Sequence, residues 1–220
     1  MEEEVLQQVD RERIVEVACN LANIVSITGE EEEVAKYLGG EFEKLGMQVE
    51  YQYVEDGRPN VVGTLKGTGG GATLMFNAHM DHFDNPQETV VDDDRIYGRG
   101  LVNMKAAFPC YIEAVAALQR AGAKLKGDLI IAGVVGEIEK AQVGRFQGKT
   151  YRGAGVGARY LMDHGVMADM CIIGEPTGLQ LQIGNAGLLW ARVSVDGKAT
   201  KFVLAACKVA QATQDWEKEY

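Results

Sequence analysis

The stretch Thr73–Asp81, TLMFNAHMD, contains the strand that decides the fold of this chain. Its first six residues form an apolar run of the length of a β-strand, and the run leads directly into a histidine and an aspartate. Leu129 to Val135 and Met170 to Ile173 are two more short apolar runs. Almost continuously apolar runs of this kind are typical of strands buried on both faces of a sheet.

Helical patterns separate these three runs. Asn103 can cap a helix over residues 104–121, with Pro109 inside it causing either a kink or a late start. A second helix is predicted over 156–163. Alternation of strand, helix and strand indicates an α/β fold, with a sheet flanked by helices on both sides.

Chemically active side chains follow each of the three predicted strands. His79, Glu137 and Glu175 come just after an apolar run. Ligands to α/β sheets usually bind in the crevice beyond the carboxyl ends of the strands. We therefore expect the three side chains to reach one rim of the sheet and form an active site there.

The region before Thr73 is predicted to contain two helices and two strands. Residues 14–25 and 34–45 have helical spacing, and Thr28-Gly29-Glu30-Glu31 has the form of a capping box for the second helix. The acidic run Glu30 to Glu33 is interpreted as a solvated helix start. Residues 47–53 and 60–65 are predicted strands, and the glycine-rich 66–71 is predicted to be a hairpin turn to the strand at 73.

Composition excludes several classes of function. Lys and Arg number 22 against 32 Asp and Glu, a formal charge of −10, which argues against a nucleic-acid groove. The sequence contains no run of about 18 apolar residues, so no membrane span is predicted. The acidic start argues against a signal peptide. Four scattered cysteines without a CxxC pair are expected to be buried free thiols, which favours the cytoplasm.

The pattern changes after Gly184. Residues 188–195 alternate as a strand does, Asp196-Gly197 marks a turn, and 202–216 has the character of a helix. This part is too short to close a core of its own. We predict a catalytic domain over residues 1–184 and the beginning of a second domain over 185–220.

His79, Asp81 and Glu175 have the chemistry of a metal site. A metal-bound imidazole commonly needs a carboxylate on its other nitrogen, which His79-Met80-Asp81 supplies. Glu137 and Glu139 form a pair of carboxylates, of which one could act as general base. His82 is interpreted as a loop residue rather than a ligand.

Two other groups of residues are interpreted as structural. His164 lies at the predicted end of a helix, where an imidazole interacts well with the helix dipole. Asp92-Asp93-Asp94 is predicted to be a surface turn. Neither is expected to take part in chemistry.

The order of the motifs resembles a known superfamily. His79-x-Asp81, then Gly98-Arg99-Gly100 leading to Asn103-Met104-Lys105, then Glu137 to Glu139, then Gly174-Glu175-Pro176-Thr177, is similar to the dinuclear-zinc superfamily of aminoacylases, acetylornithine deacetylases, succinyl-diaminopimelate desuccinylases and glutamate carboxypeptidases. The resemblance covers essentially the whole chain. It implies a zinc-peptidase-like catalytic domain with a mixed sheet, followed by an incomplete ferredoxin-like lid that in the family mediates dimerisation.

The resemblance also implies roles for individual residues. His79 and Glu175 would bind one zinc ion, Asp81 would support His79, and Glu137 would be the general base. Asn103 stands where the family has the aspartate that bridges both metals. Cobalt or manganese could replace zinc.

Some positions depart from the family pattern. Ile138 stands where the family has a glutamate ligand, unless Glu139 has taken that role, and Lys201 stands where the lid histidine would be. The family's last histidine ligand lies beyond residue 220. We therefore expect one metal site rather than two, because an amide binds zinc more weakly than a carboxylate.

Two hypotheses of function follow from this resemblance. The first is a metal-dependent hydrolase of amide bonds in N-acyl amino acids or small peptides, in which Glu137 takes a proton from the attacking water and passes it to the leaving amine. The second is a catalytically silent relative that serves as a binding or scaffold protein, with one weak metal site or none. A small-molecule substrate and a homodimer formed through the lid are expected, with no nucleic-acid or membrane partner.

Overall fold

Five strands form one mixed sheet in the order β1-β2-β6-β3-β7. The structure is a computed structural model, which describes residues 2–138, 153–182 and Lys208. The strands of this sheet are β1 (Gln48–Glu55), β2 (Arg58–Leu65), β3 (Leu74–His79), β6 (Leu129–Val134) and β7 (Met170–Ile173). Strands β6, β3 and β7 run parallel, and β1 and β2 are antiparallel to their neighbours.

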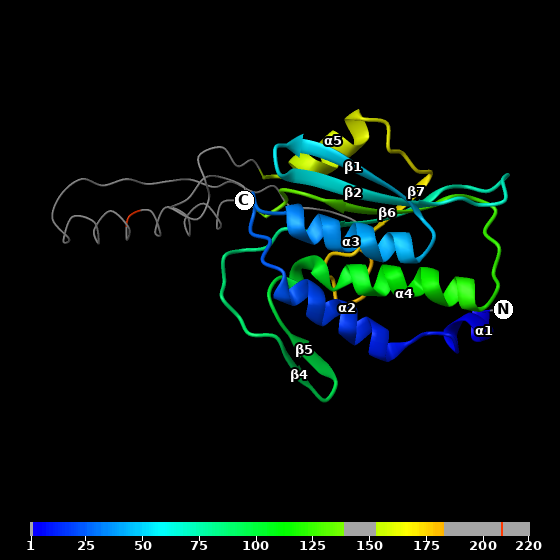
Figure 1. Ribbon diagram of the computed structural model, residues 1–220, viewed down its shortest axis with the longest axis horizontal. Coiled ribbons are helices and arrows are strands. Elements are labelled where there is room, and N and C mark those ends of the chain that lie inside the picture. Colours follow the sequence, from blue (N-terminus) through cyan, green and yellow to red (C-terminus); the bar gives the residue numbers. More distant parts are fainter. Residues whose placement is uncertain (1, 139–152, 183–207, 209–220) are drawn as a thin grey trace. The chain divides into compact units, whose positions relative to one another are not determined.

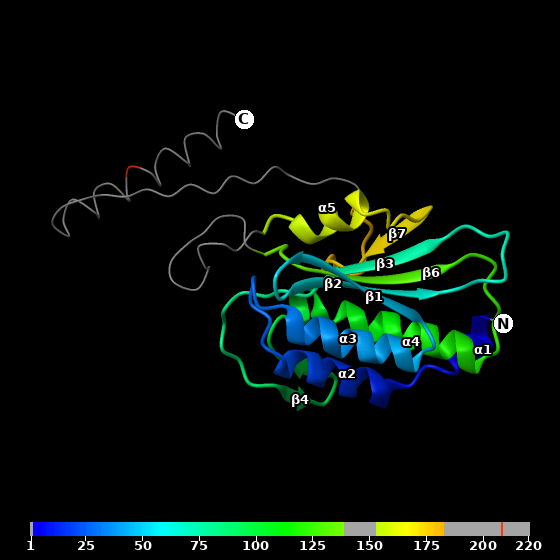
Figure 2. The same cartoon turned by 45° about the horizontal axis from the view of Figure 1, so that its top comes forward.

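Helices cover both faces of this sheet, as predicted (Figure 1, Figure 2). Three long helices lie on one face and α5 lies on the other. A short hairpin of strands β4 and β5 stands apart from the sheet. The remaining elements are α1 (Glu2–Leu6), α2 (Arg11–Asn23), α3 (Glu32–Lys44), α4 (Ala107–Arg120), α5 (Val156–Asp163), β4 (Val90–Asp92), β5 (Arg95–Tyr97) and a π-helical turn over Leu101–Lys105.

Strand β6 lies at the centre of the sheet and has a core on each side. All six of its residues are buried, which confirms the prediction for this run. Leu129 and Ile131 belong to the core under α2, α3 and α4, whereas Ile130 and Ala132 belong to the core under α5. Side chains along a strand alternate between the faces, so a strand covered on both sides must be apolar at every position.

The same prediction is wrong for β7. All four of its residues are exposed, since β7 is at the edge of the sheet and pairs only with β3 among the described residues. Apolar composition alone does not distinguish an edge strand from a central one.

The predicted hairpin between β2 and β3 is also wrong, because β6 lies between these two strands. The glycine-rich loop instead packs against the segment that precedes β6. Gly67 N–H donates to Asp128, and Thr68 and Gly69 donate to the carbonyls of Leu125 and Lys126. The glycines are needed here because a Cβ atom on Gly71 would lie 2.4 Å from the backbone nitrogen of Gly127.

Helix α4 begins three residues later than the earliest predicted start, at Ala107. Asn103 has a non-helical backbone and does not cap the helix. Pro109 lies in the first turn of α4, where backbone N–H groups make no hydrogen bonds within the helix, so the missing N–H of proline costs no hydrogen bond.

The stretch Leu101–Arg120 is long and apolar enough to cross a membrane by composition, but 61% of its apolar window is buried inside the protein. It is the core helix that covers the sheet.

The predicted capping box at Thr28 to Glu31 does not form. The residue that precedes α3 is Glu31, and it makes no side-chain cap. Its carboxylate is instead fully buried and accepts two hydrogen bonds from Arg58, at 2.9 and 2.8 Å. Burial raises the pKa of Glu31, and Arg58 opposes that rise. The acidic run is therefore not wholly a solvated helix start, because Glu31 joins α3 to β2.

Replacing Arg58 by Met is expected to destabilise the fold. The substitution leaves the Glu31 carboxylate buried without its main partner, at a cost of roughly 3–5 kcal/mol. Urea denaturation would measure this loss. The double variant Arg58→Met, Glu31→Leu is the control and should recover most of the stability. If both proteins unfold at the same urea concentration as the wild type, the pair does not stabilise the fold.

Other predictions have mixed outcomes. Cys19, Cys110 and Cys171 are free thiols as predicted, but none of the three is buried: Cys19 is half-buried, and Cys110 and Cys171 are exposed. The Asp92–Asp94 segment forms the predicted turn, between β4 and β5. Cys207 and the predicted second domain lie outside the described residues, apart from Lys208.

Candidate active site

The carboxyl ends of three parallel strands bring the predicted residues together. His79 ends β3, Glu137 follows β6, and Glu175 follows β7. The nitrogen Nε2 of His79 lies 3.8 Å from a carboxylate oxygen of Glu137 and 3.9 Å from one of Glu175. The amide oxygen of Asn103 is nearer still, at 2.8 Å. The convergence at one rim that the sequence predicted is present in the structure.

Among the residues that the structure describes, every polar partner of the His79 ring is an oxygen atom. Nδ1 contacts the backbone carbonyl of Asp81 at 3.0 Å and a carboxylate oxygen of Asp81 at 3.4 Å. Because neither oxygen can donate, Nδ1 carries a proton and donates it. Nε2 then faces three oxygens, an arrangement that favours a cation at this position, whether a proton or a metal ion. Burial lowers the pKa of His79, but Asp81, Asn103 and Glu137 outweigh it and leave the pKa raised.

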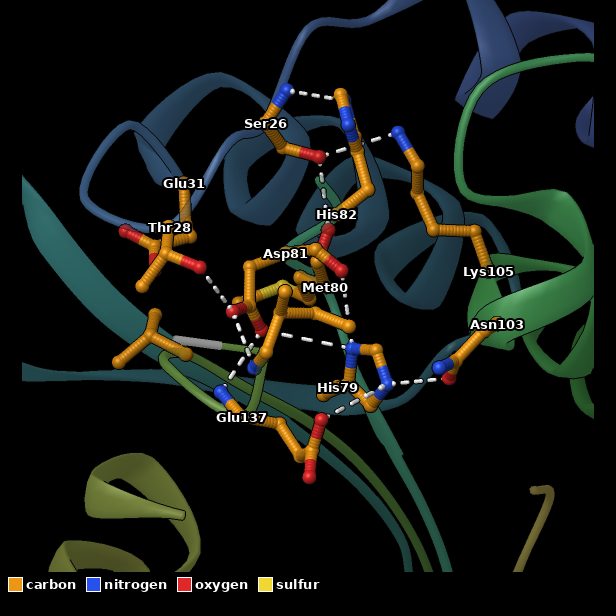
Figure 3. A network of polar contacts seen from close by, with 12 residues as sticks. Ser26, Thr28, Glu31, His79, Met80, Asp81, His82, Asn103, Lys105 and Glu137 are labelled. Atoms are coloured by element: carbon orange, nitrogen blue, oxygen red, sulfur yellow. Dashed lines mark hydrogen bonds and ion pairs between the residues drawn. The ribbon is translucent and has the colours of Figure 1, made fainter. Parts of the chain in front are cut away.

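Asp81 is the centre of the polar network (Figure 3). Its side chain is fully buried, and it accepts hydrogen bonds from Thr28 at 2.7 Å and from the backbone N–H groups of Glu137 and Ile138 at 3.0 and 2.9 Å. Burial raises the pKa of Asp81, but the hydrogen bond and charge of His79, together with these donors, hold the pKa below its usual range. The carboxylate is therefore held in its ionised form.

The segment before α4 brings Asn103 to the site. Gly100 has φ +67°, and a Cβ atom there would lie 2.8 Å from Lys105 and 2.9 Å from His82. This turn therefore requires glycine. Lys105 anchors the other end of the segment, because its fully buried ammonium group donates to the carbonyls of Leu21 and Ile24 and to the Ser26 hydroxyl.

Lys105 has a structural role in this arrangement. Burial and the charge of Arg99 lower the pKa of Lys105 to about 7. Its three acceptors, however, match the three donors of an ammonium group, and two of them are carbonyls in and just after the last turn of α2, where the helix dipole favours a cation. Lys105 thus closes the C-terminus of α2.

His82 and His164 do not face the candidate site with a free nitrogen. Nε2 of His82 accepts from the N–H of Ser26, and its Nδ1 contacts the carbonyl of Phe83. His164 caps α5, stacks on Tyr160 and contacts the Tyr160 carbonyl through Nδ1. Both positions agree with the structural roles predicted for them.

A second metal ion has few candidate ligands. Ile138 has a buried apolar side chain, and only its backbone N–H reaches the network. Glu139 and Lys201 lie outside the described residues. Among the residues that are described, no group of three or more His, Cys, Asp and Glu side chains is arranged to hold a metal. The described donors that face one another are the His79 imidazole, the carboxylates of Glu137 and Glu175, and the Asn103 amide.

In chemical type, these donors suit one divalent cation. Two ligands of a tetrahedral zinc ion, each about 2.0–2.1 Å from it, are separated by about 3.3 Å. Nε2 of His79 is 3.9 Å from Glu175, so a small side-chain movement would bring both to that spacing. Imidazole and carboxylate are ligands that zinc accepts.

Sequence reasoning missed Thr28, Ser26 and Lys105 as parts of the site's support. The local pattern of Thr28 predicts a helix cap, because a threonine three residues before a glutamate is typical of a capping box. The signal for Lys105 was its position inside an apolar segment, where an unpaired lysine is rare.

The sequence is similar to one family of peptidases and to individual hydrolases. The model of Peptidase family M20/M25/M40 matches residues 75–217. Over 180 residues the chain is 27% identical to an N-formyl-4-amino-5-aminomethyl-2-methylpyrimidine deformylase of Bacillus subtilis, an alignment that covers 77% of this chain and 39% of that protein. A succinyl-diaminopimelate desuccinylase of Rickettsia akari is 26% identical over 197 residues, with 82% of this chain and 49% of that protein covered.

The fold is similar to that of two solved peptidase structures. A tripeptidase from Staphylococcus aureus superposes with a TM-score of 0.62 at 22% identity, over 76% of this chain and 43% of that one. An aminopeptidase from Bacillus cereus superposes with a TM-score of 0.53 at 27% identity, over 59% of this chain and 38% of that one. The chain thus spans half or less of the length of these relatives.

Proposed function

The chain belongs to Peptidase family M20/M25/M40, and from this premise we propose that it is the catalytic part of a metal-dependent hydrolase of amide bonds. The proposed substrates are N-acyl amino acids or small peptides. The relatives support this class, since they are named as a deformylase, a desuccinylase and peptidases. They share cleavage of a linear amide bond and differ in the acyl group.

We propose that His79 and Glu175 hold a zinc ion, with the Asn103 amide oxygen as a third, weaker ligand. When bound, such an ion polarises the scissile carbonyl and makes water more acidic. Glu137 would act as general base, accepting the proton of the attacking water and passing it to the leaving amine. Asp81 would keep His79 in the tautomer that offers Nε2 to a metal.

One observation carries this proposal. Nε2 of the buried His79 faces oxygens of Asn103, Glu137 and Glu175, each at 3.9 Å or less. The direct test is hydrolysis of a panel of N-formyl, N-acetyl and N-succinyl amino acids and of di- and tripeptides, before and after chelation. Zinc-dependent release of a free amine supports the hydrolase. A zinc-loaded chain that cleaves no member of the panel contradicts it.

The expected zinc stoichiometry is one ion per chain. Asn103 brings no charge to a bridging position, and the Ile138 side chain cannot ligate, so a second ion would have too few ligands. Titration with zinc, followed by elemental analysis after dialysis, measures this number. Two equally tight ions per chain would overturn the expectation and indicate that Glu139 is a ligand. Cobalt and manganese serve as alternative ions in the same titration.

The second candidate function is a binding or scaffold protein without activity. Asn103 favours this alternative, because it replaces the carboxylate that would balance the charge of the metal. Zinc content distinguishes the two functions before any substrate is known. A folded chain that retains no zinc in dialysis would favour the binding protein.

The expectations about location, dimerisation and domain division remain predictions. They are a location in the cytoplasm, a homodimer formed through the region after Gly184, and the division of the chain into domains 1–184 and 185–220. Sedimentation of the purified chain at several concentrations would test the dimer.

A further inference from the structure

The segment Ile27-Thr28-Gly29-Glu30-Glu31 has no role in the function proposed above, although it lies directly against the site. Its threonine is 5% exposed and does not cap α3. The hydroxyl group of Thr28 instead donates to Asp81 at 2.7 Å. Because this hydroxyl group donates to a buried carboxylate and does not cap the helix that follows it, its effect is on the orientation of that carboxylate.

We propose that Thr28 is a positioning residue of the site: its hydroxyl group fixes the Asp81 carboxylate, and through it both the His79 ring and the backbone that carries Glu137. Three segments far apart in the sequence meet on this one carboxylate (Figure 3). One carboxylate oxygen accepts from Thr28 and from the N–H of Ile138, and the other accepts from the N–H of Glu137 and faces Nδ1 of His79.

The geometry makes the orientation of the carboxylate decisive. Asp81 is fully buried, so its donors replace the water that would otherwise solvate it. If the carboxylate turns, the contact with His79 and the two backbone contacts change together. The carboxylate contact of the imidazole and the Glu137 backbone contact therefore depend on the same torsion, which the Thr28 hydroxyl helps to hold, whereas the contact of Nδ1 with the Asp81 backbone carbonyl at 3.0 Å does not.

The loop that carries Thr28 is itself well anchored. Ser26 donates through its hydroxyl to the carbonyl of Met80 and through its N–H to His82, and His82 N–H donates back to the Ser26 carbonyl. Lys105 binds the Ser26 hydroxyl from the other side. Thr28 is thus presented to Asp81 by a rigid support, as a group that orients a ligand must be.

The test compares side chains that differ in the hydroxyl group. Thr28→Val keeps the shape and removes the donor, and Thr28→Ser keeps the donor. Thr28→Ala differs from Thr28→Ser only in the hydroxyl, and it replaces Thr28→Val if that variant does not fold. Thr64→Val on β2 is the matched control, because it removes a threonine hydroxyl from a residue that is not part of the network around Asp81.

Two measurements are made on each protein. The first is the dissociation constant for zinc, by competition with a chromophoric chelator; this one rests on the proposed function. The second is hydrogen exchange of the Glu137 and Ile138 amides by NMR in the zinc-free chain, which does not depend on metal or activity. A chain that binds no zinc would refute the metal site, and the exchange rates would still decide the role of Thr28.

We expect Thr28→Val to weaken zinc binding by about 10-fold or more, the effect usual for loss of a group that orients a ligand. The Ile138 amide should exchange faster in this variant. Thr28→Ser should match the wild type in both measurements, and Thr64→Val should change neither. The proposal is overturned if Thr28→Val exchanges like the wild type, or if Thr28→Ser is as impaired as Thr28→Ala.

Discussion

Replacing His79 by Ala is expected to abolish zinc binding. His79 supplies the only imidazole nitrogen that faces Asn103, Glu137 and Glu175 among the described residues. Loss of a residue that merely orients a ligand costs about 10- to 100-fold in affinity, so loss of the ligand itself should cost more than about 100-fold. Isothermal titration with zinc, or elemental analysis after dialysis, measures the effect.

The control for this experiment is His164→Ala. It removes an exposed imidazole whose polar and ring contacts, within the described part of the chain, are with Tyr160 of its own helix, and it should leave zinc binding unchanged. Circular dichroism in the presence of a chelator must show that the His79 variant is folded, because His79 is 2% exposed and its removal leaves a small cavity. If the folded variant keeps the zinc content of the wild type, the ion binds elsewhere.

Replacing Glu137 by Gln is expected to depress hydrolysis by roughly two to four orders of magnitude, the range usual for loss of a general base. The amide keeps the size of the carboxylate but cannot accept a proton at neutral pH. The contact of Glu137 with Asp81 is made by its backbone N–H, so the substitution leaves that contact in place. Zinc content should therefore stay at the wild-type value while kcat falls.

Glu175→Gln gives the contrasting result. It removes a proposed ligand, so zinc affinity and activity should fall together. Glu32→Gln, in the half-exposed first turn of α3, is the matched control and should change neither. If Glu139→Gln proves to be the damaging change and Glu137→Gln the mild one, the base has been assigned to the wrong member of the pair. If no substitution in the pair lowers a measurable activity, the proposed mechanism is wrong.

The candidate site could be predicted because it depends on strand ends. Apolar runs identified β3, β6 and β7, and parallel strands place the residues that follow them at one edge of the sheet. That rule needs only the order of the elements along the chain. The order of the elements therefore predicts that His79, Glu137 and Glu175 lie at one edge of the sheet, and the structure gives the distances between His79 and the two glutamates.

The support of the site could not be predicted in the same way. Thr28 and Glu31 have the local pattern of a helix cap, but each has a stronger partner that is distant in sequence, Asp81 for Thr28 and Arg58 for Glu31. A fully buried carboxylate gains more from a nearby donor than a helix start gains from a cap, since water cannot replace the donor. Local patterns do not contain those distant partners.

The α/β class, the candidate site residues and the class of chemistry that they suit can all be predicted from the sequence, because strand and helix periodicities and motif order are local properties of the chain. Only the tertiary structure decided that β6 lies between β2 and β3, that β7 is an exposed edge, and that Asp81 joins Thr28 to Glu137. These features depend on pairings between segments tens of residues apart, and burial makes such pairings stronger than the local preferences that a sequence displays.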